Sequence, residues 1–160
     1  MRIYHGSLEV VEHPLILPPQ RTLEYGQGFY TTTSERQSKE WVERRMHEKH
    51  TSCGYVNTYE LDEEKLCELK CLIFEEPNEE WAEFVMANRT RMDFAHDYDI
   101  VYGPVANDRV YLQFGLYEAG AISVETLIRE LKTYKLVDQY LFHTNKALTA
   151  LHFVEATKIG

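Results

Sequence analysis

Cysteine, long apolar runs and positive charge are all scarce in this sequence of 160 residues. The only cysteines are Cys53, Cys67 and Cys71, an odd number without the spacing of paired metal ligands, which argues against a disulfide framework and a zinc site. We expect these cysteines to be reduced and mostly buried. No apolar run approaches the roughly 18 residues needed to cross a bilayer, and the N-terminus lacks the apolar segment of a signal peptide, so we expect a cytoplasmic protein with no membrane contact.

Acidic residues outnumber basic ones by 26 to 17, which gives a formal net charge of −9 at pH 7. This balance opposes broad docking on a nucleic-acid backbone, because such docking needs a basic face. A local patch could still hold a nucleic acid, and one predicted helix carries Arg36, Lys39, Arg44 and Arg45, although such a run is more often a solvated helix face. The length and an apolar content of 44% predict a single domain over residues 1–160.

Strand and helix signals follow one another irregularly, which predicts the α+β fold class and not a doubly wound parallel sheet. Ser34 and Gln37 have the spacing of a capping box, and Asn78 is expected to cap a later helix. Residues 109–118 fit either a helix capped by Asp108 or an alternating strand. The predicted strands cover residues 2–5, 29–33, 55–61, 69–74, 98–102, 140–143 and 152–157. The predicted helices cover residues 34–49, residues 145–151 and segments that begin after residues 78 and 123. An irregular loop is predicted for residues 13–28.

The stretch YHGS, residues 4–7, combines three residue types that suit a polar ligand. A histidine such as His5 offers two ring nitrogens to sugar hydroxyls, Gly6 lets a ligand approach the backbone, and Ser7 adds a rotatable hydroxyl. Taken alone, the tripeptide is more often a surface histidine in a turn than a ligand site. The glycines of GQGFYT lead into a strand and not a helix, which excludes a Rossmann or P-loop phosphate site.

Two aromatic residues, Tyr30 and Trp41, could sandwich a flat heterocycle from a strand and from the following helix. A cationic ring such as oxidised nicotinamide would gain a cation–π contribution of roughly 0.5 to 2 kcal/mol. The alternative is that Trp41 belongs to the core with Val42 and Met46.

Together, YHGS and YGQGFYTTTSERQSKEW resemble the first two motifs of the ADP-ribosyltransferase superfamily, in its poly(ADP-ribose) polymerase-like and diphtheria-toxin-like branch. In that branch the pattern is His-Gly-Ser/Thr followed by Gly-x-Gly-x-Tyr. The resemblance implies that NAD is bound by His5, Gly6, Ser7, Tyr30, Ser38 and Trp41. It implies that the histidine binds an NAD ribose, that the glycine backbone and the serine of the helix hold the carboxamide, and that the two aromatic rings hold nicotinamide.

The third catalytic position of the better-studied relatives is a glutamate near the start of a late strand, and by order it corresponds here to Gln139. The resemblance therefore implies a His-Tyr-Gln variant with His5, Tyr30 and Gln139 as catalytic residues. A neutral amide can orient the ribose 2′-hydroxyl, but it stabilises developing positive charge less than a carboxylate does. Single transfer or NAD hydrolysis is thus expected in preference to chain elongation.

Four further side chains near these motifs have open roles. Asp138 is expected to face away from Gln139, because neighbouring residues of a strand point to opposite faces. Asp99 and Asp108 could each supply a carboxylate or serve the structure alone, and His143 could face either the site or water.

More closely, the chain resembles a bacterial family within this superfamily thought to be toxins of toxin–antitoxin pairs, through the stretches YHGS, GFYTT, EEWAEFV, YDIVYGPVANDR and DQYLFHTNKALTALHF. The resemblance implies ADP-ribosyltransferase-like split antiparallel sheets flanked by helices, and a mono-ADP-ribosyltransferase (a glycosyltransferase) that uses NAD as co-substrate without a metal. It also implies a small antitoxin protein and a macromolecular acceptor, either protein or nucleic acid, as partners. The alternatives are a domain on the same fold that binds NAD, ADP-ribose or a protein without catalysis, and a metal-dependent nuclease, for which no ligand cluster is visible.

Overall fold

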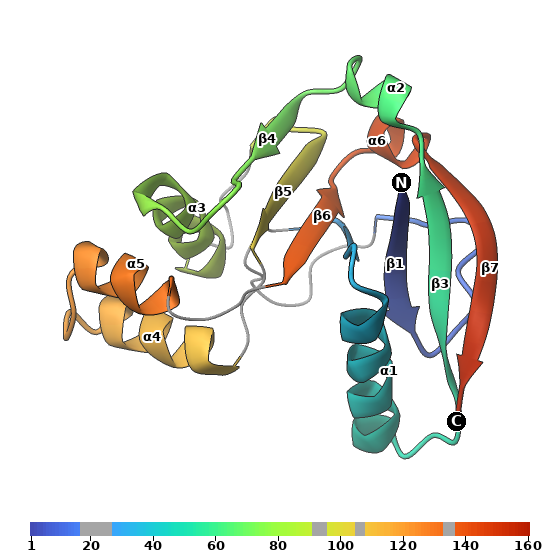
Figure 1. Ribbon diagram of the computed structural model, residues 1–160, viewed down its shortest axis with the longest axis horizontal. Helices are drawn as coiled ribbons and strands as arrows, with labels where there is room; N and C mark the ends of the chain where they lie inside the picture. Colours follow the sequence, from blue (N-terminus) through green and yellow to red (C-terminus); the bar gives the residue numbers. More distant parts are fainter. Residues whose placement is uncertain (17–26, 91–95, 105–107, 133–136) are drawn as a thin grey trace.

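The computed structural model describes residues 1–16, 27–90, 96–104, 108–132 and 137–160, and these form a mixed α+β fold with two sheets (Figure 1). The strands are β1 Arg2–Ser7, β2 Phe29–Thr31, β3 Gly54–Leu61, β4 Cys71–Ile73, β5 Ile100–Pro104, β6 Asp138–Phe142 and β7 Leu151–Ile159. The helices are α1 Glu35–Lys49, α2 Glu63–Leu66, α3 Glu79–Thr90, α4 Asp108–Glu118, α5 Val124–Leu131 and α6 Asn145–Leu148. One sheet has the antiparallel order β1-β3-β7, and the other has the order β2-β6-β5-β4, in which only β4 and β5 are parallel.

The two sheets touch at an isolated bridge between Tyr4 and Thr32. Each of these residues donates its N–H to the carbonyl oxygen of the other, at 2.8 and 2.9 Å. Because paired residues share a face, the face of Tyr4 and Gly6 continues across the bridge to Tyr30. Helix α1 packs on this face beside β1, and Figure 1 shows the group α3, α4 and α5 beyond β4 and β5.

Two hydrophobic clusters lie on opposite faces of the β2-β6-β5-β4 sheet. Strand β6 contributes to both, because Leu141 points to one face and Phe142 to the other, and both are fully buried. The cluster under α3, α4 and α5 contains Phe74, Trp81, Ala82, Val85, Val101, Phe114, Leu127, Leu131 and Leu141. The cluster on the other face contains Ile3, Phe29, Tyr59, Leu61, Ile100, Phe142, Ala147 and Ala150.

The predicted helix starts are confirmed at two caps. The Ser34 hydroxyl accepts a hydrogen bond from the Gln37 N–H at 3.1 Å, and the Asn78 side chain accepts one from the Trp81 N–H at 2.8 Å. The ambiguous stretch after residue 108 is the helix α4, whereas residues 63–66 form α2 behind the cap Asp62. The predicted loop falls largely on residues 17–26, which lie outside the described residues.

Several predicted strand boundaries are wrong, and pairing explains the difference. Strand β1 does not stop at Gly6 but continues to Ser7, since Gly6 pairs with Val56 inside the ladder. Strand β5 likewise runs through Gly103 and Pro104, which lie opposite the first two residues of β6. The predicted strand at 69–74 shortens to β4, and the last strand extends to Ile159.

The cysteines are free thiols, but the prediction that they are mostly buried is wrong. Cys53 and Cys71 are half-buried, and Cys67 is exposed because it ends α2, a four-residue helix with no buried side chain. Within the described ranges, no helix combines the length and the apolarity that crossing a membrane requires.

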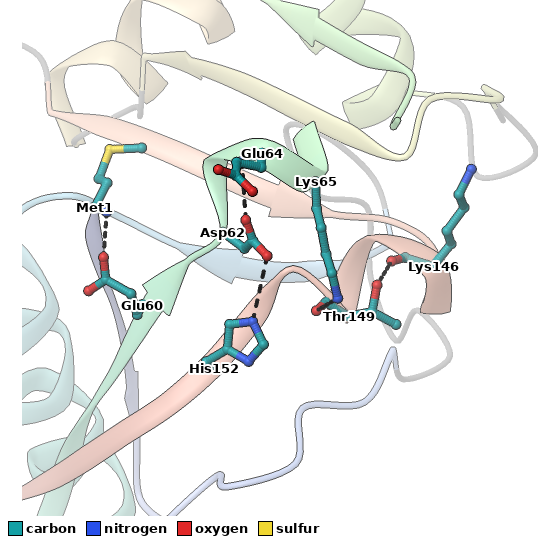
Figure 2. Close-up of polar contacts among 8 residues, drawn as sticks. All are labelled: Met1, Glu60, Asp62, Glu64, Lys65, Lys146, Thr149 and His152. Carbon is teal, nitrogen blue, oxygen red and sulfur yellow. Dashed lines mark hydrogen bonds and ion pairs between the residues drawn. The ribbon is translucent and has the colours of Figure 1, made fainter. Parts of the chain in front are cut away.

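A group of polar contacts holds α2 and α6 over the ends of β3 and β7 (Figure 2). The Lys65 ammonium donates to the Thr149 carbonyl oxygen at 3.0 Å, and the His152 ring lies 3.9 Å from the Asp62 carboxylate. At the neighbouring strand end, the α-amino group of Met1 donates to the Glu60 carboxylate at 2.6 Å. These contacts fix the two short helices at the end of the sheet away from α1.

Candidate functional site

The imidazole of His5 lies between the two sheets. Its Nδ1 atom is 2.7 Å from the carbonyl oxygen of Tyr30, and because a carbonyl oxygen only accepts, Nδ1 donates. The ring also packs on Phe29, with centroids 4.2 Å apart. Burial lowers the pKa of His5 and outweighs the hydrogen bond that raises it, so the ring is neutral at pH 7. The His5 side chain thus bonds to the Tyr30 carbonyl oxygen, which a backbone N–H of β1 would bond to if the ladder continued. The pairing of β1 with β2 therefore ends at the bridge between Tyr4 and Thr32.

Beyond this bridge β1 and β2 are no longer paired, and we call the opening between them the split. The backbone of Gly6 faces this split. Tyr4 uses both of its backbone groups on Thr32, and residues two apart in an antiparallel strand direct these groups to the same side. The N–H and C=O of Gly6 therefore point toward β2, where the described residues form no further bridge to β1. A Cβ on Gly6 would lie 2.7 Å from the Ser38 carbonyl oxygen and 2.8 Å from Val42 Cγ2, so α1 packs this closely only against glycine.

Helix α1 places Ser38 and Trp41 against this strand. Ser38 is 3% exposed, and within the described part of the chain its hydroxyl oxygen has no hydrogen-bond partner. Trp41 is 38% exposed while Val42 beside it is fully buried, so the alternative that Trp41 belongs to the core is wrong. The Arg44 guanidinium lies 5.8 Å from the centroid of the Trp41 ring.

Tyr30 and Gln139 share one face of the four-stranded sheet. Tyr30 lies opposite Leu141 in the β2–β6 ladder, and Gln139 is two residues before Leu141, which makes it a diagonal neighbour of Tyr30. The residue opposite Gln139 on β5 is Gly103, so that strand places no side chain beside the amide. The Gln139 Oε1 atom is buried, and no described group forms a hydrogen bond with it.

The structure therefore brings most of the predicted set together. The Gly6 backbone and the side chains of Tyr30, Ser38, Trp41 and Gln139 lie on one face around the split. The side chains of His5 and Ser7 point to the other face of β1, where the Ser7 hydroxyl accepts from the Glu9 N–H at 3.2 Å.

Asp138 has a structural role on the face away from Gln139, as predicted. It accepts hydrogen bonds from the Thr33 N–H at 2.9 Å, from the Thr33 hydroxyl at 2.6 Å and from the Tyr102 hydroxyl at 3.1 Å. Burial, with the nearby Asp138 carboxylate as a second cause, raises the pKa of Tyr102 to about 12.

Asp99 also serves the structure. Its carboxylate accepts from the Thr144 hydroxyl at 2.6 Å and from the Lys70 N–H at 2.9 Å, and these two bonds lower its pKa. The side chain of Asp108 lies outside the described residues. Neither Asp99 nor Asp138 offers an unpaired carboxylate to the Gln139 amide.

His143, whose role the sequence left open, is half-buried. Its Nδ1 atom lies 2.6 Å from the Gln27 carbonyl oxygen, and burial lowers its pKa to about 4. The Nε2 atom is buried and has no partner among the described groups. His143 directly follows β6, and the odd-numbered spacing of 139, 141 and 143 is the sequence signal that places it on the face of Gln139.

Residues 1–153 match the family described as Protein of unknown function (DUF3990). The chain belongs to that family. No curated protein and no solved structure matches it. Membership of DUF3990 thus names no chemistry.

The DUF3990 chain also has a hollow of about 300 Å³ at the end of the four-stranded sheet, lined by Phe74, Glu75, Glu76, Pro77, Tyr102, Pro104, Leu131, Lys132, Val137 and Asp138. None of these lining residues belongs to the predicted NAD-binding set. In the described ranges, no group of three or more His, Cys, Asp or Glu side chains is placed to hold a metal ion. The face around the split instead carries two unpaired acceptor atoms, Ser38 Oγ and Gln139 Oε1, together with the aromatic residues Tyr30 and Trp41, and these residue types suit a planar polar ligand.

Proposed function

We propose that this chain is an NAD-dependent mono-ADP-ribosyltransferase with the ADP-ribosyltransferase-like fold of split antiparallel sheets. The observation that carries the proposal is the split itself, where the Gly6 backbone points toward β2 and where, among the described residues, Ser38 Oγ and Gln139 Oε1 have no hydrogen-bond partner. A buried polar group left unpaired costs about 1 to 3 kcal/mol. A ligand that satisfies these groups regains that free energy, which favours a ligand with both donors and acceptors.

Nicotinamide fits these groups in shape and in polarity. Its carboxamide has an NH₂ donor and a carbonyl acceptor, which complement the C=O and N–H of Gly6 and the hydroxyl of Ser38. Its cationic ring can stack on Trp41, which keeps an exposed surface, with Tyr30 on the neighbouring strand. The rings and the carboxamide groups together fix the orientation of the ring.

Gln139 lies beside the bond that breaks in this proposal. The bond between the ribose C1′ atom and the nicotinamide nitrogen breaks, its electron pair leaves with nicotinamide, and C1′ then bonds to the acceptor nucleophile, which gives its proton to solvent. The Gln139 carbonyl oxygen accepts a hydrogen bond from the ribose 2′-hydroxyl and aligns the ring. An amide dipole stabilises the positive charge on the ribose less than a carboxylate would, so one transfer, or NAD hydrolysis, is the expected outcome.

The partners follow from the resemblance to bacterial toxins. They are a macromolecular acceptor in the cytoplasm and a small antitoxin protein that neutralises the activity. The net charge of −9 favours a protein acceptor over a nucleic acid.

The test uses purified protein, NAD labelled in its adenylate part, and a bacterial lysate. We expect released nicotinamide and one labelled ADP-ribose on an acceptor, which mass spectrometry identifies. Tyr30→Ala and Gln139→Ala should abolish both signals, and Gln113→Ala on α4 is a matched control that should keep them. Failure of the wild-type protein to release nicotinamide or to transfer label would overturn the proposal.

The neutral Gln139 favours a second candidate, a domain that binds NAD or ADP-ribose without chemistry. Such a domain would bind NAD in calorimetry and leave it intact in the presence of lysate. Nicotinamide release therefore separates the two functions.

A further inference from the structure

Three buried side-chain atoms lack a hydrogen-bond partner among the described residues: Ser38 Oγ, Gln139 Oε1 and His143 Nε2. The first two belong to the proposed NAD site, Ser38 Oγ beside the nicotinamide carboxamide and Gln139 Oε1 beside the ribose. The third, on His143, has no role in the chemistry proposed above. It nevertheless lies on the same face as Gln139, because positions 139, 141 and 143 alternate to one face of the chain.

The position of His143 is fixed by its contact with β2. A Cβ on Gly28 would lie 2.9 Å from His143 Nδ1, so the ring lies directly against the residue two before Tyr30. Leu141 lies opposite Tyr30, and Gln139 and His143 are therefore its diagonal neighbours on either side. The two acceptor atoms without partners flank Tyr30 along the strand.

The protonation of the His143 ring is also fixed. The Gln27 carbonyl oxygen can only accept, so Nδ1 carries the hydrogen of that 2.6 Å bond. A neutral ring with hydrogen on Nδ1 has a bare lone pair on Nε2, which makes this atom an acceptor only. The ring of His96 stands nearly perpendicular to it, with centroids 4.4 Å apart.

We propose that His143 Nε2 accepts a hydrogen bond from a hydroxyl of the ADP-ribose part of the ligand. The inference rests on the proposed NAD site and extends it. Gln139 and His143 are four positions apart, about 13 Å at roughly 3.3 Å per residue. This separation exceeds the size of a nicotinamide ring, which Ser38 and Trp41 hold beside Gly6. The part of the ligand that reaches His143 is therefore its sugar and phosphate part. In that part, a hydroxyl is the group that can donate a hydrogen bond to the bare Nε2 nitrogen of His143.

The experiment is nitrogen-15 NMR of the histidine rings in the full chain, with His143 assigned from a His143→Gln variant. Without ligand, the Nε2 resonance of His143 should be that of a bare ring nitrogen without a hydrogen bond. Saturating ADP-ribose should shift it toward the hydrogen-bonded position, and nicotinamide alone should leave it unchanged. The exposed His152 on β7 is the internal control and should not move with either compound.

Affinity gives the second measurement. A net hydrogen bond of about 0.5 to 1.5 kcal/mol corresponds to an affinity for ADP-ribose weakened roughly 2- to 13-fold in His143→Gln. His152→Gln should bind as the wild type does, and both variants should bind nicotinamide equally. A role of His143 in folding alone would lower the melting temperature without moving the wild-type Nε2 resonance when ADP-ribose binds.

The outcomes separate this inference from the proposed function. If ADP-ribose quenches Trp41 fluorescence but leaves the His143 Nε2 resonance in place, the role of His143 is wrong and the NAD site stands. If neither signal responds to ADP-ribose or NAD, both are wrong. A His143 ring that carries its hydrogen on Nε2 in the free protein would also overturn the inference.

Discussion

Replacing Gly6 by alanine should damage stability and ligand binding together, because the backbone at this position is in contact with α1. The added Cβ would lie 2.7 Å from the Ser38 carbonyl oxygen, 2.8 Å from Val42 Cγ2 and 3.0 Å from Trp41 Cδ1. The first of these atoms is backbone, so α1 itself has to move. Overpacking of this kind costs about 1 to 3 kcal/mol. For a chain of 160 residues, this corresponds to a melting temperature lower by roughly 2 to 12 °C.

The matched control is Gly115→Ala on the exposed side of α4. A Cβ at Gly115 would meet nothing within 4 Å, and alanine in a helix interior is more favourable than glycine by about 0.5 to 1 kcal/mol. Gly115→Ala should therefore melt at the wild-type temperature or a few degrees above it. Thermal unfolding followed by circular dichroism measures both variants, and calorimetry with ADP-ribose should show a loss of at least about tenfold for Gly6→Ala only. A Gly6→Ala protein that melts and binds like the wild type would refute the packing of Gly6 on α1.

Three other changes test neighbouring parts of the site. The pKa of His143 is lowered from 6.5 to about 4, so as the pH falls the unfolded chain binds a proton on this ring before the folded protein does, and the free energy of unfolding should fall by about 2 kcal/mol between pH 7 and pH 5. Urea unfolding of His143→Gln should therefore show a weaker dependence of stability on pH than the wild type. An equal dependence in both proteins would contradict the burial of the ring. Gln139→Glu should speed nicotinamide release at least about tenfold, measured by chromatography, because a carboxylate stabilises the positive charge on the ribose better than an amide does. A slower variant would contradict the position of Gln139 beside the ribose. Asp138→Asn should lower the free energy of unfolding by roughly 1.5 to 3 kcal/mol, because it weakens the bonds to Thr33. It should also lower the pKa of Tyr102 from about 12, measured by ultraviolet titration, and an unchanged pKa would refute the contact between Tyr102 and Asp138.

Local signals were enough to predict the elements that carry the candidate site. A serine or asparagine cap depends on residues three apart, and both Ser34 and Asn78 form the expected bonds. The alternation along β6 also depends only on neighbours, so the opposite orientations of Asp138 and Gln139 followed from the sequence. The sequence predicts a start at residue 140, whereas β6 begins at Asp138, because its first two residues pair with Gly103 and Pro104, whose types usually end a strand.

What the sequence could not predict depends on contacts between distant segments. Gly6 looks like a strand end, and only its pairing with Val56 and its contact with α1 show that it lies inside a ladder. The exposure of Trp41 also depends on what surrounds α1, since its spacing with Val42 fits a core stripe equally well. Neither the split beside Gly6 nor the unpaired atoms of the site has a signature in residue spacing.

His5 and His143 contact the backbone in the same way. His5 donates from Nδ1 to the Tyr30 carbonyl oxygen, and His143 donates from Nδ1 to the Gln27 carbonyl oxygen, three residues earlier on the segment that leads into β2. In both rings burial favours the neutral form, so each holds its hydrogen on Nδ1 and leaves Nε2 as the acceptor nitrogen. An anionic group of a ligand gains nothing from such a nitrogen, whereas a hydroxyl does. A ribose contact by His5, which the sequence motif implies, is therefore available only through Nε2, and the same rule at His143 selects sugar hydroxyls over phosphates.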